Sequence, residues 1–198
     1  MLRAPFFHRE APALEGPRVR LRMPQLGDYA EWAALRGESR AFLEPWEPKW
    51  AVDELSRHSF RLRVRKAREE LDRGTAVSFF LFHQQTERLV GGITIGNIRM
   101  GVAQSAHIGY WMGERYAGRG LMHDALRLVI PFAFDSLRLH RLEAACIPTN
   151  NRSIRLLEKA GFQREGLLRS YLRINGTWQD HLLYALIADE HRARARRG

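Results

Sequence analysis

The chain has 198 residues, 45% of them hydrophobic, a formal charge of +10 and one cysteine, Cys146. This length favours a single domain with a sizeable core, and one cysteine excludes a disulfide framework. No apolar run approaches the roughly 18 residues of a membrane span, and the first 16 residues lack the apolar segment of a secretory signal, so we expect a cytoplasmic protein outside the membrane. The basic charge favours anionic partners such as nucleic acid, the ribosome or a phosphate-rich cofactor.

The first half of the chain predicts two helices around a proline-containing loop. In chain order we expect a strand at residues 19–23, a helix at 27–35 stopped by Gly37, a loop at 42–48 and a helix at 53–73 stopped by Gly74. Apolar residues at helical spacing indicate the long helix, and two prolines that restrict the residues before them indicate the loop.

The second half alternates strands and helices, which is typical of one mixed sheet. We expect strands at residues 77–83, 89–98 and 107–112, a helix at 122–134, a strand at 142–147, a helix at 150–159 and strands at 162–173 and 178–187. Pro131 should kink or shorten its helix, and Asn175-Gly176 is a strong hairpin signal. The fold class is therefore α/β or α+β.

We expect an N-terminal extension at residues 1–16, one domain at 17–188 and a basic tail at 189–198. The tail looks disordered and holds four arginines, Arg192, Arg194, Arg196 and Arg197. Six further basic residues lie on the predicted helix 53–73, namely Arg57, Arg61, Arg63, Arg65, Lys66 and Arg68. No aromatic residues alternate with them, as a surface that stacks single-stranded nucleic acid would need.

The most informative segment is a glycine-containing turn between the strand 107–112 and the following helix. Its residues are Ala117, Gly118, Arg119, Gly120, Leu121 and Met122. Glycines at such a turn let backbone N–H groups approach a phosphate, and the helix N-terminus adds a partial positive charge. The turn is a candidate pyrophosphate cradle, although strand-to-helix turns also use glycine for backbone reasons alone.

The order of elements over residues 18–188 resembles the GNAT superfamily of N-acetyltransferases. The resemblance implies a central mixed, mostly antiparallel twisted sheet flanked by helices, with splayed strands forming the acetyl-CoA cleft. The family's phosphate loop runs Gln or Arg, two residues, Gly, one residue, Gly or Ala. We align it with residues 117–122, with Gly120 as the central glycine. This alignment departs from the pattern at both ends, with Ala117 in place of Gln and Met122 in place of Gly. Residues 115–120 fit the pattern literally, but they start too soon after the strand and leave too little room for the turn.

Several stretches, in family order, are similar to the ribosomal-protein alanine N-acetyltransferases, the RimJ/RimL group. They are residues 42–48 (FLEPWEP), 108–111 (IGYW), 118–122 (GRGLM), 150–153 (NNRS) leading to 160–162 (AGF), and 175–181 (NGTWQDH). The similarity implies transfer of an acetyl group from acetyl-CoA to the α-amine of a protein N-terminus. The implied acceptor is a ribosomal protein that begins with alanine.

The same resemblance implies which residues bind the cofactor. Backbone groups of Tyr110, Trp111 and Met112 would pair with the pantetheine arm, as an added strand pairs with a sheet edge. Amides of the turn 117–122 would hold the pyrophosphate, with a side-chain contact from Arg119. No metal ion is implied.

Two residues at the start of the helix 150–159 have both a family role and a local one. By resemblance, Asn150 would bond to the pantetheine arm and Ser153 would protonate the leaving thiolate. Asn150 also suits a helix N-cap, so its two roles compete for one side chain, and Ser153 also suits local bonding in the first turn.

The general base is the least defined part of the site. One branch of the group uses a glutamate, but the matching position here is close to Leu172, which cannot act. His107 is a candidate because an ordinary histidine pKa of ~6.5 suits a base. Glu44 and Glu47 are further candidates, and ion pairs with arginines are the alternative for both. A site without an obvious carboxylate base suits an α-amine, with a pKa of ~7.7–8.0, better than lysine, with ~10.4.

Two other functions stay open. Within the same fold, the acceptor could be a small amine, an amino acid or an antibiotic. In another class, the chain could be a basic RNA- or ribosome-binding module with a regulatory or vestigial acyl-CoA site. The oligomeric state is expected to be a monomer or a homodimer.

Overall fold

Among the residues that the structure describes, eight strands form one open sheet. The computed structural model describes residues 11–195. The strands are β1 (Ala13–Glu15), β2 (Val19–Arg22), β3 (Val77–His83), β4 (Leu89–Arg99), β5 (Ser105–Met112), β6 (Arg141–Cys146), β7 (Gln163–Ile174) and β8 (Thr177–Ile187). Their order is β1-β2-β3-β4-β5-β6-β8-β7, and each neighbouring pair is antiparallel except β5 and β6. The expected mixed, mostly antiparallel sheet is confirmed.

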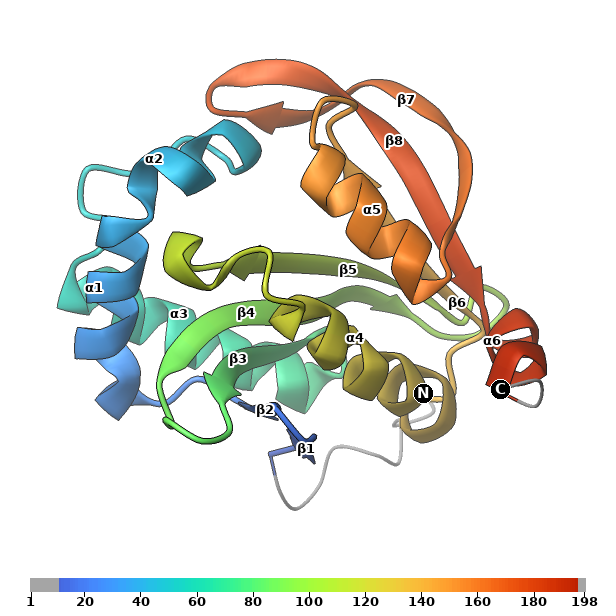
Figure 1. Ribbon diagram of the computed structural model, residues 1–198, viewed down its shortest axis with the longest axis horizontal. Coiled ribbons are helices and arrows are strands. Elements are labelled where there is room, and N and C mark those ends of the chain that lie inside the picture. The colour runs from blue at the N-terminus through green and yellow to red at the C-terminus, as the bar shows by residue number, and fades with distance from the viewer. Residues whose placement is uncertain (1–10, 196–198) are drawn as a thin grey trace.

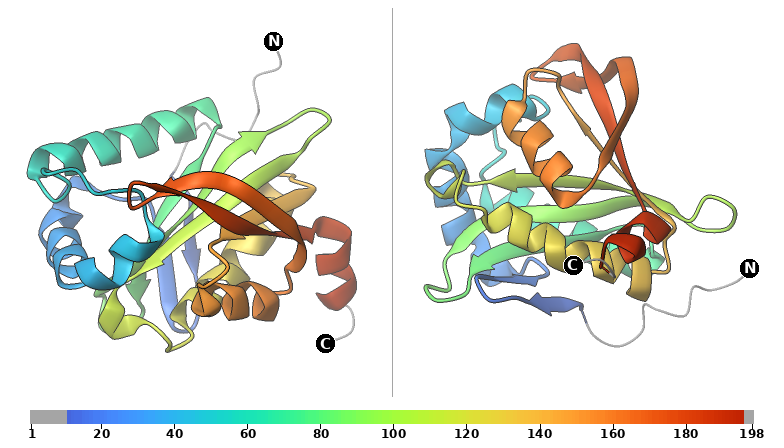
Figure 2. Two further views of the ribbon diagram at one scale, coloured as in Figure 1. Left: turned by 90° about the horizontal axis from the view of Figure 1, so that it is seen from above. Right: turned by 45° about the vertical axis from the view of Figure 1, so that its right-hand side comes forward.

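Helices cover both faces of this sheet. They are α1 (Tyr29–Glu38), α2 (Arg40–Leu43), α3 (Arg57–Arg73), α4 (Leu121–Pro131), α5 (Asn151–Ala160) and α6 (Ala188–Ala195). Short 3-10 turns are η1 (Leu26–Asp28), η2 (Glu44–Trp46) and η3 (Glu114–Tyr116), and η4 (Phe132–Ser136) is a π-helical segment. α3 lies on one face of the sheet and α4 on the other (Figure 1, Figure 2). Within residues 11–195, no helix combines the length and apolar character needed to cross a membrane.

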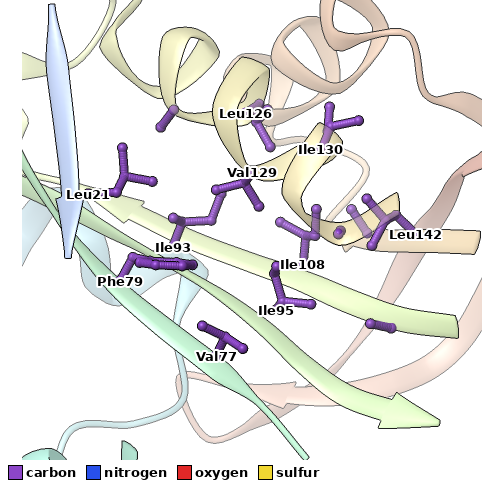
Figure 3. Close-up of a cluster of buried hydrophobic side chains, with 14 of the residues drawn as sticks. Leu21, Val77, Phe79, Ile93, Ile95, Ile108, Leu126, Val129, Ile130 and Leu142 are labelled. Carbon is purple, nitrogen blue, oxygen red and sulfur yellow. The ribbon is translucent and has the colours of Figure 1, made fainter. Parts of the chain in front are cut away.

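The main core lies between α4 and the sheet. Leu126, Val129 and Ile130 are at most 3% exposed and point from α4 towards the strands (Figure 3). Their spacing of three and four residues puts them on one face of the helix, opposite Phe79 and Ile93. Burying one such side chain contributes roughly 1.5–3 kcal/mol. The packing therefore fixes the start of α4, and the glycine turn before it, against the sheet.

Most predicted elements are confirmed, several of them to within one or two residues. β3 has the predicted bounds, and Gly74 and Gly161 end α3 and α5 with φ angles of 68° and 97°. Asn175 and Gly176 both have positive φ, as a type I′ hairpin turn requires.

Three predictions of local structure were wrong. The helix expected from residue 53 begins at Arg57, because Ser56 is its N-cap and accepts from the Ser59 N–H. Gly37 does not stop α1, because the helix continues to Glu38 and ends at Ser39 without a left-handed residue. The segment 42–48 is not loop throughout, because its first two residues end α2 and the next three form η2. Pro45 lies in the first turn of η2, where a missing N–H costs nothing.

Pro131 shortens its helix, as predicted. It is the last residue of α4, and the chain continues in a wider π turn, in which the Leu137 N–H donates to the Phe132 carbonyl. A proline without an N–H donor interrupts the regular ladder at this place.

The two ends of the chain are more ordered than expected where the structure describes them. Residues 13–15 of the predicted extension pair with β2. The predicted disorder of the tail was wrong for Arg192, which lies in α6 and forms ion pairs with Asp135 and Asp189 at 3.7 and 3.4 Å. Residues 1–10, Arg196 and Arg197 lie outside the described residues.

β5 and β6 run together over a short stretch and then separate. Residues 105–107 pair with 141–143, whereas β5 stays paired with β4 as far as Met112. The second half of β5 therefore has an edge that β6 does not cover. This arrangement confirms the expected splayed strands.

The β7–β8 hairpin reaches over this opening towards α2 (Figure 1). At its tip, the Asn175 backbone N–H donates a hydrogen bond of 2.8 Å to the Glu47 carbonyl. This hydrogen bond connects the proline-containing segment 42–48 to β7 and β8, which lie at the end of the sheet beyond β6.

Candidate active site

A cleft of about 500 Å³ lies along the uncovered edge of β5. We call it the β5–α5 cleft, because the end of β5, the first turn of α4 and the face of α5 line it. The other lining residues are Tyr116, Ala117, Gly118 and Gly120 in the turn and Phe42, Leu43, Trp46 and Glu47 in the proline-containing segment. Its volume is in the range of small-molecule sites. Of the twelve residues predicted to act, ten line it: Tyr110, Trp111, Met112, Ala117, Gly118, Gly120, Leu121, Met122, Asn150 and Ser153.

The glycine turn has the backbone geometry of an anion site. Gly118 and Gly120 have φ angles of 76° and 80°, in the left-handed region that favours glycine. Gly120 is the N-cap of α4, and the first helical bond runs from the Asp124 N–H to its carbonyl at 3.1 Å. The N–H groups of the first turn have no acceptor within the helix, so they are available to an anion in the cleft.

Arg18 stabilises this turn through hydrogen bonds to two of its neighbours. Its Nε donates to Asp124 Oδ2 at 2.6 Å and its Nη1 to the Arg119 carbonyl at 3.3 Å. A Cβ added at Gly120 would lie 3.0 Å from Arg18 Nη2. Arg119 contributes this carbonyl to the support, but its side chain is exposed and it does not line the cleft. Its predicted phosphate contact stays a prediction that this placement does not favour.

Basic side chains surround the cleft on the α5 side. Arg152, Arg155 and Lys159 line it from α5. Together with the turn, they give the cleft a positive character suited to a ligand with several phosphates. The backbone edge, the anion-binding turn and these cations all fit the parts of coenzyme A.

Ser153 is tied to two neighbours at the inner end of the cleft. It is 9% exposed, and its Oγ lies 2.5 Å from the Tyr110 hydroxyl oxygen. Its backbone N–H donates to Asn150 Oδ1 at 3.1 Å, so Asn150 is the N-cap of α5. The cap uses the amide oxygen and leaves the NH₂ group of Asn150 as a donor, so the two predicted roles are compatible.

Burial sets the protonation of the groups beside Ser153. It raises the pKa of Tyr110 well above the ordinary tyrosine value, and the bond to Ser153 offsets part of that rise. Burial also raises the pKa of the Cys146 thiol, again partly offset by Ser153. The tyrosine is therefore a neutral hydroxyl that can donate a proton, and Cys146 is a buried, protonated thiol.

Of the three candidate bases, Glu47 lines the same cleft as Ser153, whereas His107 and Glu44 do not. His107 lines neither cavity, and its Nε2 is 2.9 Å from Glu143 Oε2 at the closed end of the splayed strands. Leu172 is 42% exposed on β7 and lines neither cavity. Glu44 pairs with Arg40 at 2.7 Å. The role predicted for His107 stays untested, and its position does not favour it.

A second cavity of about 760 Å³ lies on the other side of β5. We call it the β4–α3 groove, because β4, α3 and residues 47–50 line it together with α1. Within residues 11–195, three residues line both cavities, namely Glu47, Tyr110 and Trp111. The two cavities therefore meet at the end of β5, next to the Ser153–Tyr110 pair.

Paired charges and tryptophans form the wall at this meeting point. Arg36 is 5% exposed and donates to both oxygens of Glu47, at 2.8 and 2.7 Å. Its guanidinium lies over the rings of Trp50 and Trp111, at 4.4 and 5.1 Å from their centroids. A Cβ added at Gly92 would lie 2.3 Å from Trp111 Nε1, so this glycine admits the indole against β4.

Sequence reasoning missed Arg36 and the side chain of Tyr110. Arg36 follows Trp32 by four residues and Leu35 by one, so it lies on the buried face of α1. An arginine on an apolar helix face is a signal for a buried ion pair. Tyr110 alternates with Ile108 along β5, which places its side chain on the core face towards α5.

Comparisons with known proteins agree with this geometry. Residues 18–163 match the family model described as acetyltransferase (GNAT) domain. The probable N-acetyltransferase YjcK of Bacillus subtilis is 36% identical over 88% of this chain and 96% of its own length. The [ribosomal protein uS5]-alanine N-acetyltransferase of Escherichia coli is 33% identical over 86% of this chain and 91% of its own.

Solved structures give the same picture. RimJ of Mycobacterium smegmatis in complex with CoA-disulfide is 35% identical, with a TM-score of 0.83 over 94% of this chain and 93% of its own. The ribosomal-protein-S5-alanine acetyltransferase from Vibrio fischeri is 30% identical, with a TM-score of 0.83 over 90% of this chain and 97% of its own. The chain therefore belongs to the GNAT family of acetyltransferases and is an acetyl-CoA-dependent enzyme related to the RimJ/RimL group.

Proposed function

We propose that the protein acetylates the α-amine of a protein N-terminus, with a ribosomal protein that begins with alanine as the acceptor and acetyl-CoA as the donor. The observation that carries the proposal is the meeting of two cavities at the end of β5. The β5–α5 cleft fits the cofactor, and the β4–α3 groove offers a second ligand a separate approach. Relatives named as ribosomal-protein alanine and serine acetyltransferases support this class of acceptor.

The chain's own groups supply orientation and one proton. Acetyl-CoA, when bound, supplies a thioester whose acetyl group passes to the amine while a thiolate leaves. The uncovered edge of β5 and the first turn of α4 would hold the two ends of the cofactor. Ser153 would donate a hydrogen bond or a proton to the leaving sulfur. The Tyr110 hydroxyl would then donate a proton to the Ser153 oxygen. Asn150 would bond the pantetheine arm through its NH₂ group.

An α-amine suits a site without a free base beside Ser153. At pH 7.5, roughly a third of α-amines are already neutral, compared with roughly a thousandth of lysine side chains. Glu47 lines the place where the two cavities meet, but both of its carboxylate oxygens accept hydrogen bonds from Arg36, so it is not a free base. We infer that an acceptor which loses its proton to water needs no dedicated base.

Turnover of defined peptides tests the proposal. We expect rapid acetylation of a peptide that begins with alanine and almost none of a blocked peptide with an internal lysine. Kcat/KM should rise with pH through the pKa of the peptide's own amine. Efficient acetylation of the lysine peptide, with the alanyl peptide ignored, would overturn the proposal.

A ribosomal acceptor fits the charge of the chain, and it places the protein in the cytoplasm. The net charge of +10 favours approach to an RNA-rich particle. Part of the basic helix is neutralised within α3, where Lys66 and Arg68 pair with Glu70 and Asp72 at 3.6 and 3.7 Å. We therefore treat contact with nucleic acid as secondary to recognition of the protein N-terminus.

A further inference from the structure

The carboxylate of Glu47 lies where the cofactor and the acceptor would meet. Among the described residues that line the β5–α5 cleft, Glu47 is the only acidic one, and it also lines the β4–α3 groove. An acceptor amine reaches the site as a cation with three N–H donors. The position and charge of Glu47 make it the natural partner for that cation.

Three donors fix this carboxylate. Arg36 Nη1 donates to Oε1 at 2.8 Å, Arg36 Nη2 to Oε2 at 2.7 Å and Trp50 Nε1 to Oε2 at 2.9 Å. The backbone of Glu47 is held as well, because its carbonyl accepts from the Asn175 N–H at the hairpin tip. The side chain is therefore oriented before any ligand arrives, which lowers the entropic cost of binding.

The count of acceptor positions leaves one available. An ionised carboxylate has about four lone-pair positions on its two oxygens. Arg36 and Trp50 use both positions on Oε2, whereas Oε1 has one donor, Arg36 Nη1. Oε1 can thus accept one further hydrogen bond without giving up its present partner.

We propose that Glu47 Oε1 accepts a hydrogen bond from the α-ammonium of the acceptor and places this group beside Tyr110 and Ser153. The inference rests on the proposed function and deepens it, because it names the group that recognises the charged N-terminus. Glu47 takes no proton in this scheme. Its role is to bind and orient the amine, and to disfavour an N-terminus that is already acetylated and has no charge.

Binding of matched peptides tests the inference without turnover. The protein saturated with coenzyme A is titrated calorimetrically with an alanyl peptide and with the same peptide N-acetylated. A hydrogen bond to a charged group predicts that the parent binds the free peptide about 10- to 100-fold more tightly. Glu47→Gln should lose most of this preference while its affinity for coenzyme A stays within about two-fold of the parent's.

Glu44→Gln is the matched control. Glu44 lies three residues earlier, pairs with Arg40 at 2.7 Å and lines neither cavity, so the same substitution should leave the preference intact. Equal loss of affinity for both peptides in Glu47→Gln would mean a merely structural role and would overturn the inference. So would a retained preference in that variant.

A measurement on the parent covers the case in which Glu47→Gln does not fold. The alanyl peptide is compared with a peptide whose α-amine is replaced by a hydroxyl group, as in an N-terminal lactyl residue. Equal affinities would overturn the inference with no variant at all. Failure of the proposed function is a separate result, because it would show as absent turnover of the alanyl peptide by the parent.

Discussion

The two cavities on either side of β5 are built by different means. The β5–α5 cleft depends on backbone: an uncovered strand edge, a turn with two glycines of positive φ and the first turn of α4. The wall of the β4–α3 groove near the meeting point depends on side chains from separate segments, with Arg36 on α1, Glu47 and Trp50 after η2, and Trp111 on β5. A ligand bound through the main chain tolerates side-chain changes, whereas a ligand chosen by side chains does not. We therefore expect substitutions to impair the proposed cofactor site by changing its backbone conformation and the proposed acceptor site by changing its side-chain chemistry.

The largest expected effect is at Ser153, which is an exception to this contrast because its side chain acts in the cleft proposed for the cofactor. Ser153→Ala should lower kcat by about 10²- to 10⁴-fold, the range of general-acid groups, because the leaving sulfur loses its donor. Affinity for acetyl-CoA should stay within a few-fold, since the backbone contacts remain. Steady-state kinetics combined with calorimetry separates the two effects. An unchanged kcat would contradict this prediction and leave Ser153 with a structural role alone.

Ser105, a buried serine on β5, serves as the control for stability. Ser153→Ala leaves the half-buried Tyr110 hydroxyl without its partner, at a cost of about 0.5–1.5 kcal/mol. Ser105 is 3% exposed, and its Oγ has no hydrogen-bond partner among the described residues. Ser105→Ala removes an unsatisfied polar group, so its free energy of unfolding should equal or exceed the parent's. Urea unfolding of both variants measures the difference.

Gly120→Val should weaken the binding of acetyl-CoA by changing the backbone conformation of the glycine turn. The residue has a φ of 80°, and the new Cβ would lie 3.0 Å from Arg18 Nη2. Backbone strain of about 1–3 kcal/mol adds to the lost amide contacts, so we expect acetyl-CoA affinity to fall by about 100-fold. Gly101→Val is the control, because Gly101 has a φ of 69° but its Cβ meets nothing within 4 Å and it lines neither cavity. Unchanged affinity in Gly120→Val would favour the alternative alignment of the phosphate loop.

The same contrast explains what could be predicted from the sequence. Strands, helices and the glycine turn follow from local rules of spacing, proline and glycine, and they already contain most of the proposed cofactor site. Motif resemblance added Asn150 and Ser153, both of which line the cleft. Local rules also account for β3 and for the Asn175-Gly176 hairpin.

The acceptor side could not be predicted in this way. Arg36 and Glu47 are eleven residues apart and Trp111 is distant from both, so their contact depends on how α1 and the hairpin tip pack on the sheet. His107 was chosen for its chemistry, but strand pairing places it next to Glu143. The helical turns at 42–46 escaped notice because the two prolines indicated loop. Pairings over long distances are set by the tertiary fold and leave no periodic signal.

Gly92→Ala should weaken the acceptor side while leaving the cofactor side almost intact. The added Cβ would lie 2.3 Å from Trp111 Nε1, so the indole must move away from β4 and from Arg36. Overpacking of this kind costs about 1–3 kcal/mol, so we expect KM for the peptide to rise about tenfold and the melting temperature to fall by several degrees. Gly166→Ala on β7 is the matched control, since its Cβ meets nothing within 4 Å. A larger effect on acetyl-CoA affinity than on peptide KM would show that the two sides are not separable at Trp111.

The smallest expected effect lies at the closed end, where β5 and β6 still pair. Arg141 forms a bidentate pair with Glu165, which holds the pKa of that carboxyl below its ordinary value. Because the pKa of Glu165 is lower in the folded than in the unfolded chain, its ionised form stabilises the fold. This stabilisation is complete above the ordinary glutamate pKa of ~4.3 and is lost as the pH falls through the folded-state pKa. Because Glu165 is 41% exposed, the contribution is below about 1 kcal/mol. Glu165→Gln should therefore lower the free energy of unfolding slightly at pH 7, and the parent and the variant should converge once the pH falls below the lowered pKa of Glu165. The pair lies outside both cavities, so kcat and both KM values should match the parent's at pH 7. A change in peptide KM would show instead that the closed end controls how far β5 and β6 separate.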